Sequence, residues 1–495
     1  MTGYEDLDEL LIGDGYLTPG YFIDQGTYNY PTPTETNFWF INFMTDELQE
    51  NVDEYDPDWF GVRSTMFGYH TWQQLVGRDF HGRNAHDDSE MWTLAYERVN
   101  TCNMILAAID QQPAADEEAM RERNRVKGEA AFLRGVYYYF LVNLYGKPYA
   151  PSTAQTTPGV PLKLTEYVED VEFARASVAA VYRQIVNDLD MAETCLQAYP
   201  DNKSPYRAGL RAVYIFRSRV ALYMQDWETA KAYAQKAIDL NATLLDLATV
   251  SPDAFPFSRE CPELVFSMGG NMTTAAILLG DYYTTYKLSD ELCALYSQDD
   301  LRRGRYFTYD DSEDNLPTLR KVDNTFAGML GRPAEMSDCF VLRNSEAYLN
   351  LAEAAACLND EGTAKTTLTR FLANRMATVD VSATGDDLIS FIRDERAREF
   401  CLEGQRWFDL RRYTVCERLP WSKTIEHVFS LYGGTWGEWT STYHYRLEPN
   451  DAAYTLDIPE EVRQQQPSIG SNPRPARPVI TSEDITDEDY EDDWY

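Results

Sequence analysis

One stretch near the C-terminal end, residues 393–413, constrains the fold of this chain more than any other. It reads RDERAREFCLEGQRWFDLRRY, with arginines and acids arranged around an apolar stripe at helical spacing. The stripe consists of Leu388, Ile389, Ile392 and Phe400. Burying so many charges is costly unless they pair with one another. We therefore expect a packing junction between two helices, with arginine–glutamate pairs, a C-cap glycine at Gly404 and Trp407 filling a hole.

The length and the charge of the chain limit its architecture and its partners. With 495 residues, of which 44% are hydrophobic, it can form one large domain or about two to three ordinary ones. The 80 acidic residues outnumber the 44 basic ones, and the formal net charge is -36. Such a surface repels phosphate groups, so nucleic acids and anionic membranes are disfavoured as partners. The 34 tyrosines exceed what a core needs, and tyrosine favours binding surfaces.

Cysteine spacing and hydropathy give further limits. No two of the eight cysteines lie within four residues of each other, so CxxC and zinc-ribbon motifs are excluded and we expect no disulfide framework. Cys102, Cys195, Cys357 and Cys401 fall in helical patterns and are interpreted as small buried apolar residues. No apolar run reaches the length of a transmembrane helix, and no signal peptide is visible after Met1.

Two segments carry the pattern of helical hairpins. Residues 205–240 and 343–376 each combine small and large apolar residues at helical spacing with a short polar turn, as tetratricopeptide-type units do. Further helices are expected over 89–110, 117–145 and 174–198. Helix pairs of this kind stack on their neighbours and bury a shared core. We therefore predict an all-α, tetratricopeptide-like scaffold with long irregular loop insertions.

The remaining segments are predicted to be loops that interrupt this scaffold. They comprise residues 51–88, a central insertion over 245–340 and a second insertion over 414–455. The acidic segment 482–495 is interpreted as a mobile tail. We expect residues 1–240 and 241–495, the second part including a helical unit over 343–412, to form one compact unit with the loops gathered on one face.

Several blocks of the sequence, in this order, resemble the SusD/RagB family. Thr45-Asp46-Glu47 matches a short Ser/Thr-Asp-Glu segment, and VKGEAAFLRGVYYYFLVNLYG over 126–146 matches a long family helix. Residues 399–412, with the order E-x3-E-G-x-R-W-F-D-L-R-R, match the C-terminal motif, and residues 456–473 resemble the terminal P-I-P-x-x-E…N-P pattern. These blocks lie in the scaffold, whereas the loops between them match no pattern.

The resemblance implies a location and a partner. SusD/RagB proteins are surface lipoproteins of Bacteroidetes that capture nutrients for a TonB-dependent outer-membrane transporter. For this chain it implies a non-catalytic cell-surface binding protein, a SusC-like transporter as partner and no cofactor. It also implies that a signal peptide and a lipid-bearing cysteine precede Met1 in the full-length protein and supply the only membrane attachment.

No motif of a catalytic or metal site is found. The five histidines all fall in loop-like stretches, and they are His70, His81, His86, His427 and His444. Glu395 and Glu399 lie one helical turn apart, but pairing with Arg396 and Arg398 is favoured over glycosidase chemistry. The acidic run over 310–315 lacks the glycine and the glutamate of a calcium loop, and a solvated loop is favoured there. We therefore predict no catalytic residue and no metal.

Aromatic residues in the loops are the candidates for ligand contact. A sugar ring packs its C–H face on tryptophan or tyrosine, while its hydroxyls bind nearby amide, carboxylate or guanidinium groups. In the family, the ligand binds to loops that correspond loosely to residues 55–90 and 266–330 of this chain. The predicted ligand-binding residues are Trp59, Trp72, Phe80, Asn84, Tyr282, Tyr283, Tyr286, Arg302, Arg305, Tyr306, Tyr309 and Arg320.

The sequence leaves the class of ligand open. An oligosaccharide is favoured by the aromatic loops, whereas a peptide is an alternative because the loop arginines could hold carboxylates. A third hypothesis is a tetratricopeptide-type adaptor that binds a partner protein, against which the long insertions argue. A fourth is an α-helical glycosidase, for which no convincing acid pair is found.

Overall fold

A computed structural model gives the fold of the chain. The structure describes residues 3–17, 38–51, 62–167, 171–202, 204–270, 286–309, 317–322, 336–433 and 438–484. Most of its regular structure is helical. The helices are α1 (Tyr4–Leu10), α2 (Val62–His70), α3 (Glu90–Ala108), α4 (Glu117–Tyr145), α5 (Val178–Cys195), α6 (Leu210–Met224), α7 (Trp227–Leu240), α9 (Asp290–Ala294), α10 (Asn344–Cys357), α11 (Glu361–Leu372), α12 (Gly385–Glu399), α13 (Arg406–Thr414) and α14 (Glu460–Gln465).

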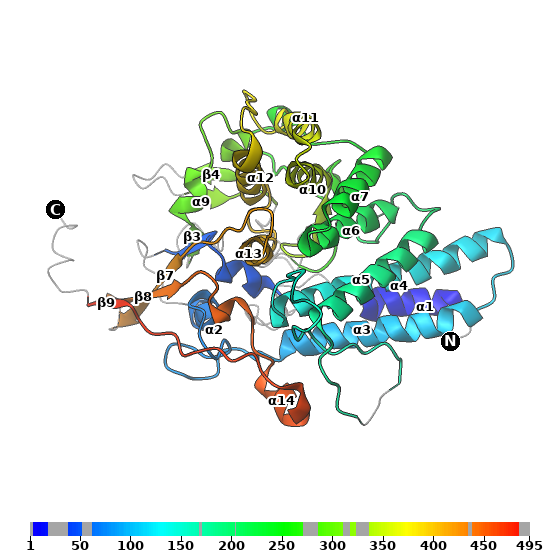
Figure 1. The fold of residues 1–495 in the computed structure, drawn as a ribbon, viewed down its shortest axis with the longest axis horizontal. Coiled ribbons are helices and arrows are strands. Elements are labelled where there is room, and N and C mark those ends of the chain that lie inside the picture. The colour runs from blue at the N-terminus through cyan, green and yellow to red at the C-terminus, as the bar shows by residue number, and fades with distance from the viewer. Residues whose placement is uncertain are drawn as a thin grey trace.

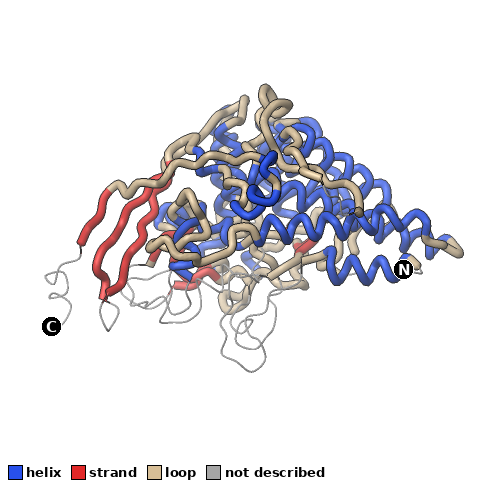
Figure 2. The backbone as a smooth tube through the Cα atoms, turned by 90° about the horizontal axis from the view of Figure 1, so that it is seen from below, coloured by secondary structure: helices blue, strands red, loops and turns tan. Residues whose placement is uncertain are grey.

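The described strands are short except for one hairpin, and they pair only antiparallel. They are β1 (Leu48–Glu50), β2 (Leu264–Ser267), β3 (Tyr286–Leu288), β4 (Phe307–Tyr309), β5 (Pro317–Leu319), β6 (Val341–Arg343), β7 (Ile425–Gly433), β8 (Glu438–Leu447) and β9 (Thr481–Asp484). β1 pairs with β3, β2 with β6 and β4 with β5, while β7, β8 and β9 form a three-stranded sheet. In Figure 2 this sheet lies at the end of the molecule opposite the N-terminus.

The scaffold is a stack of antiparallel helices. Each of α3 to α7 packs on its sequence neighbour, and α7 then packs on α10, which contacts α11 and α12. In Figure 1 the stack runs from α3 and α4 at the right to α11 and α12 at the top. The predicted tetratricopeptide-like scaffold is thus confirmed, and its two predicted hairpins lie directly against each other although about a hundred residues separate them in the chain.

The two hairpins use the same turn chemistry. In the α6–α7 turn Gln225 has a φ of 62°, and Asp226 accepts a hydrogen bond from the backbone N–H of Thr229 at 3.2 Å. In the α10–α11 turn Asn359 has a φ of 60°, and Asp360 caps α11 in the same way. A left-handed residue ends the first helix and an aspartate begins the second, so both hairpins close with a two- to three-residue turn.

The core is centred on α4 and α10. Residues 128–145 of α4 are all buried, and so is every residue of α10. A helix that is buried all round lies inside a layered structure rather than on its surface. Alanines at positions 352 and 354–356 keep the side chains of α10 short, and this lets α7, α11 and α12 approach it closely.

All three segments predicted as loops contain regular structure, and the central insertion over 245–340 holds β2 to β5 and α9. Residues 62–70 form α2, which ends at His70, within the segment expected to be a loop over 51–88. Most of the insertion over 414–455 forms the β7–β8 hairpin, in which Ile425, His427 and Phe429 are buried and Glu426 is exposed. This alternation is the period of a half-buried strand, and the high aromatic content of the segment hides it in the sequence.

Two smaller expectations at the C-terminal end are also wrong. Ser482–Asp484, expected to belong to a mobile tail, are part of β9 and pair with β8, whereas residues 485–495 lie outside the described part of the chain. Gly404 does not cap the first helix of the charged junction, because α12 ends at Glu399 and Phe400 follows as its C-cap. Gly404 instead lies in the turn before α13 with a φ of 68°.

Candidate functional site

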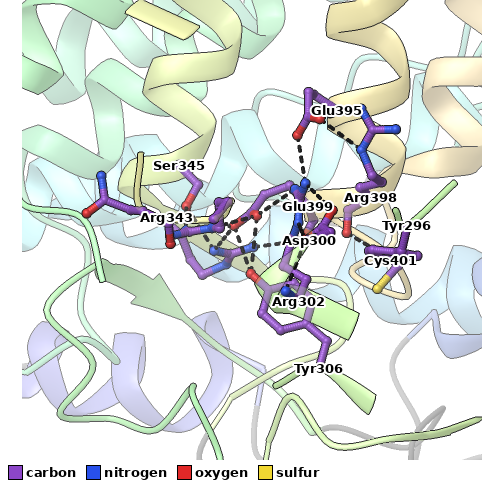
Figure 3. A network of polar contacts seen from close by, with 12 residues as sticks. Tyr296, Asp300, Arg302, Tyr306, Arg343, Ser345, Glu395, Arg398, Glu399 and Cys401 are labelled. Carbon is purple, nitrogen blue, oxygen red and sulfur yellow. Dashed lines mark hydrogen bonds and ion pairs between the residues drawn. The ribbon is translucent and has the colours of Figure 1, made fainter. Parts of the chain in front are cut away.

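The charged stretch that dominates the sequence forms a buried ion-pair network (Figure 3). Glu399 at the end of α12 accepts hydrogen bonds from Arg343 Nη1 at 2.8 Å and from Arg375 Nε at 2.9 Å, and it contacts Arg302 Nη1 at 3.4 Å. The hydroxyl of Tyr306 lies 3.2 Å from both carboxylate oxygens. All these side chains are buried. The predicted arginine–glutamate junction is therefore present, and four separate segments meet in it.

This network cannot act as a pair of catalytic acids. Burial alone would raise the pKa of Glu399, but the charges of Arg375 and Arg343 hold it well below the usual range. Arg302 and Arg398 likewise lower the pKa of Glu395 against the effect of burial. Both carboxylates are thus ionised near pH 7 and paired with arginines, which does not suit the proton donor that glycoside cleavage requires.

A second set of ion pairs joins α10, α12 and α13. Glu353 of α10 binds both terminal nitrogens of Arg412 at 2.7 Å, and Asp409 bridges Arg412 and Arg396 at 2.7 Å and 3.0 Å. Trp407 is completely buried and stacks on Tyr454 with ring centroids 5.0 Å apart. Most of the stretch over 393–413 is consequently scaffold.

Four of the predicted ligand-binding residues belong to the core. Arg302 and Tyr306 are part of the Glu399 network and have no exposed surface. Trp72, which exposes 1% of its surface, donates its indole N–H to the carbonyl of Met44 at 3.0 Å, and Tyr286 in β3 is completely buried. A side chain buried in this way offers nothing to a ligand, so these four residues do not belong to the candidate site.

Trp72 and Tyr286 belong to a stacked layer that the sequence does not indicate. His427 of β7 lies between Trp72 and His70, with ring centroids 4.3 Å and 4.0 Å away, and His70 meets Tyr286 edge-on at 4.9 Å. Burial lowers the pKa of His427 to about 4, so its imidazole is neutral near pH 7. Two of the histidines expected in loops, His70 and His427, are therefore buried residues of α2 and β7.

The structure brings Phe80 to the surface beside the β7–β8 hairpin. Phe80 is half-buried, and its ring stacks on Phe429 at 5.2 Å and meets Tyr443 at 4.8 Å. Asp79 Oδ1 accepts hydrogen bonds from the backbone N–H groups of His81 and Arg83 and so fixes the turn that carries Phe80 and the exposed Asn84. We call Phe80, Asn84, Phe429 and Tyr443 the Phe80 shelf, and it is the candidate functional site.

The other predicted residues are not brought together with this shelf. The guanidinium groups of Arg305 and Arg320 donate to the backbone carbonyls of Val250 and Asp253, and Arg320 also lies over the ring of Phe255 at 5.0 Å. Tyr309 contributes its backbone to β4, opposite Pro317. The predicted contacts at Trp59, Tyr282 and Tyr283, and the acidic run over 310–315, lie outside the described residues.

The sequence does not predict one cavity that the structure contains. A groove of about 580 Å³ lies between α3, the connector residues 161–167 and 171–173, and the C-terminal segment around α14. Trp92 and Tyr96 on α3 fit the 3.6-residue period of a core helix, so the pattern alone assigns them to packing. An exposed tyrosine and a phenylalanine in the following connector, Tyr167 and Phe173, are the signal that could have drawn attention to it.

Sequence families and solved structures agree on what this fold is. A family model described as "Starch-binding associating with outer membrane" matches residues 39–222, and the model of the SusD family matches residues 308–474. No curated protein matches the chain significantly. Among the described residues, no helix is long and apolar enough to cross a membrane.

Solved structures show the same architecture over almost the full chain. A SusD superfamily protein from Bacteroides thetaiotaomicron is 20% identical, with a TM-score of 0.73 and coverage of 95% of this chain and 100% of its own. A SusD-like carbohydrate binding protein from Bacteroides vulgatus is 19% identical, with a TM-score of 0.69 and coverage of 95% and 98%. At these identities the likeness shows the fold alone. Since two models of one family match in order, one in each half, this chain belongs to the SusD/RagB family.

Proposed function

We propose that this protein is a non-catalytic binding protein of the outer-membrane surface that captures an oligosaccharide for a TonB-dependent transporter. Membership in the SusD/RagB family supports the role in nutrient binding and the location at the outer membrane. The description of one matching family model names starch binding, and one structural relative is named a carbohydrate binding protein. An N-terminal lipid anchor and a SusC-like barrel as partner complete the proposal.

The Phe80 shelf is the observation that favours an oligosaccharide. Phe80 is backed by Phe429 and Tyr443, and its turn is held by Asp79, so the aromatic surface exists before a ligand arrives. A preformed ring surface packs on the C–H face of a sugar without losing side-chain freedom. The exposed amide of Asn84 can donate to and accept from hydroxyl groups at the edge of that surface.

The structure gives less support to peptide capture. That alternative depends on loop arginines that could hold carboxylates. Arg302 is buried among carboxylates, and Arg305 and Arg320 already donate to backbone carbonyls. We therefore keep peptide capture as an outcome of the experiment and not as a second proposal.

The test is calorimetric titration of the protein with a panel of oligosaccharides and with a tryptic peptide mixture. We expect at least one oligosaccharide to bind and to be recovered intact after the titration. Phe80→Ala should weaken its binding about tenfold, because one aromatic contact contributes roughly 1–1.5 kcal/mol. Asn84→Ala should weaken binding without disturbing any packing, since this side chain is exposed.

Leu75→Ala is the matched control. Leu75 exposes 46% of its surface in the same part of the chain but lies outside the shelf, so this change should leave the affinity unaltered. Binding of peptides with no response to any oligosaccharide would contradict the proposed ligand class. Cleavage of a bound oligosaccharide would contradict the non-catalytic role.

A further inference from the structure

We propose that the groove between α3 and α14 is a second carbohydrate-binding site, distinct from the Phe80 shelf, that takes a neutral oligosaccharide. The inference rests on the proposed ligand class and extends it to a part of the chain outside the predicted loops. In Figure 1 α14 lies well away from β7 and β8, which carry the shelf. The groove encloses about 580 Å³, which is within the range of roughly 300–1,000 Å³ for small-molecule sites.

Four aromatic side chains, together with Val462 and Ile469, form the apolar part of the groove. Tyr96 lies one helical turn after Trp92 on α3, with ring centroids 5.0 Å apart, and its hydroxyl donates to the carbonyl of Pro161 at 2.8 Å. Phe173 lines the groove from the connector and Ile469 from the C-terminal segment. Because Tyr96 is fixed at both ends, its ring is held in the orientation that a stacked ligand requires.

The two walls of the groove are tied together. The backbone N–H of Phe173 donates to the side-chain carbonyl of Gln466 at 3.2 Å, and the N–H of Ser468 donates to Glu172 at 3.1 Å. Within the connector, Lys163 donates to the carbonyl of Tyr167 at 2.6 Å and lies over the ring of Phe173 at 5.7 Å. The connector and the segment after α14 therefore hold each other in position, although almost 300 residues separate them in the chain.

Tyr167 is the most exposed part of the groove. It shows 67% of its surface to solvent, the highest value among the large hydrophobic residues of the described chain. A tyrosine this exposed has no packing role that would explain its position. Its ring lines the groove together with Tyr96 and Phe173 and offers a further surface on which a sugar can pack.

Polar side chains at the rim match the chemistry of sugar hydroxyls. Glu97 and Asn100 follow Tyr96 on α3, and Gln465 faces them from α14. Amides and carboxylates bind vicinal hydroxyls through paired donors and acceptors. Glu97 and the net charge of -36 disfavour anionic ligands, and Lys163, the single basic residue of the lining, is already engaged.

The same lining argues against a peptide. Extended peptides are usually bound by adding a strand to an exposed sheet edge, where backbone groups are free. Among the described residues the groove is lined by the helices α3 and α14 and by irregular segments, and no strand contributes to it. A neutral oligosaccharide fits the alternation of rings and planar polar groups better.

The experiment compares three proteins by saturation-transfer NMR with maltoheptaose, xylohexaose, mannohexaose and cellohexaose as probes. The proteins are the wild type, Phe80→Ala and Tyr167→Ala. We expect at least one probe to bind Phe80→Ala as well as the wild type and to bind Tyr167→Ala at least about fivefold more weakly. Asn100→Ala should reproduce the loss, since it changes the polar rim and no ring.

Leu164→Ala is the control. Leu164 is 42% exposed in the same connector but does not line the groove, so its loss should leave all binding unchanged. If every probe that binds depends on Phe80 and none on Tyr167, the groove is not a carbohydrate site, and the proposed function stands. If binding depends on Tyr167 and not on Phe80, the groove is a carbohydrate-binding site and the Phe80 shelf is not. If no probe binds any of the three proteins, the inference is overturned.

Discussion

Glu399 shows how this chain tolerates so much buried charge. Three arginines, from the turn after α11, from β6 and from the segment before β4, approach one carboxylate, and Glu263, Glu395, Glu403 and Asp300 balance them. Each positive group therefore faces at least one negative group inside hydrogen-bonding distance. Such a network contributes little compared with an apolar core, but removing one member leaves the others unpaired in a region without water.

Removing the charge of Glu399 tests this balance of buried charges. Glu399→Gln keeps the shape of the side chain but removes its charge, leaving Arg343 and Arg375 with Glu263 as the carboxylate that they still share. We expect a loss of about 3 kcal/mol or more in the free energy of unfolding, measured by urea titration. Asp386→Asn removes an equally charged group that is 60% exposed and paired with Arg418, and it should cost no more than about 0.5 kcal/mol. Similar losses for both variants would show that the network is not special.

At the scale of elements, the turn between α12 and α13 depends on one glycine. Gly404 has a φ of 68°, its N–H donates to Asn42 at 3.0 Å, and a Cβ there would lie 3.0 Å from the Cα of Cys339. Left-handed backbone and lack of space both require glycine at this position. The sequence predicts a structural role for Gly404, but as the C-cap of a helix, and α12 ends before it.

Gly385 allows these two causes to be separated. It has a φ of 55°, yet a Cβ built on it meets nothing within 4 Å. Gly385→Ala should therefore cost only the strain of the left-handed backbone, about 1–2 kcal/mol. Gly404→Ala should cost at least about 1 kcal/mol more, because the turn must also move away from Cys339. Both values follow from urea titrations, and equal losses would contradict the crowding argument.

At the scale of the whole molecule, a segment near the N-terminus is bound to the C-terminal junction. Asp46 forms a two-bond ion pair with Arg406 at 2.7 Å and 2.8 Å, and Glu47 accepts the N–H of Leu402 at 3.0 Å. The charge of Arg406 overcomes the effect of burial and lowers the pKa of Asp46. Burial and the neighbouring Asp46 raise the pKa of Glu47 to about 8. These contacts join parts of the chain about 355 residues apart.

A pH dependence of stability follows from Glu47. Between its ordinary pKa of 4.5 and about 8, the folded protein holds a proton that the unfolded chain releases, so this residue makes stability fall as pH rises. Glu47→Gln removes the titration, and its amide can still accept from Leu402. We expect the free energy of unfolding of Glu47→Gln, compared with that of the wild type, to rise by at least about 1 kcal/mol between about pH 5 and pH 8.

Urea titrations at several pH values measure this difference. Glu426→Gln, which removes a negative charge from a side chain that is 56% exposed and paired with Arg446, reports the effect of losing a surface charge and should be subtracted. A difference between Glu47→Gln and the wild type that stays constant over this range would show that Glu47 is ionised in the folded protein.

Much of the scaffold follows from the sequence alone. The helices α3 to α7 and α10 to α12 depend on local spacing, and local spacing is visible in one sequence. The surroundings of Arg302, Tyr306 and Trp72 are not visible in the sequence in this way. These residues have the composition of a binding loop, and only their long-range partners, such as Glu399 and His427, show that they are buried.

The candidate binding surfaces were decided by tertiary structure for the same reason. Phe80 gains its rigid backing from a hairpin about 350 residues later, and the α3–α14 groove exists only because the segment over 466–468 binds the one over 172–173. A sequence determines which residues can form a helix or close a turn, since those interactions span a few positions. Whether an aromatic side chain ends in the core or at a surface depends on which distant segment packs against it, and that is settled only when the chain folds.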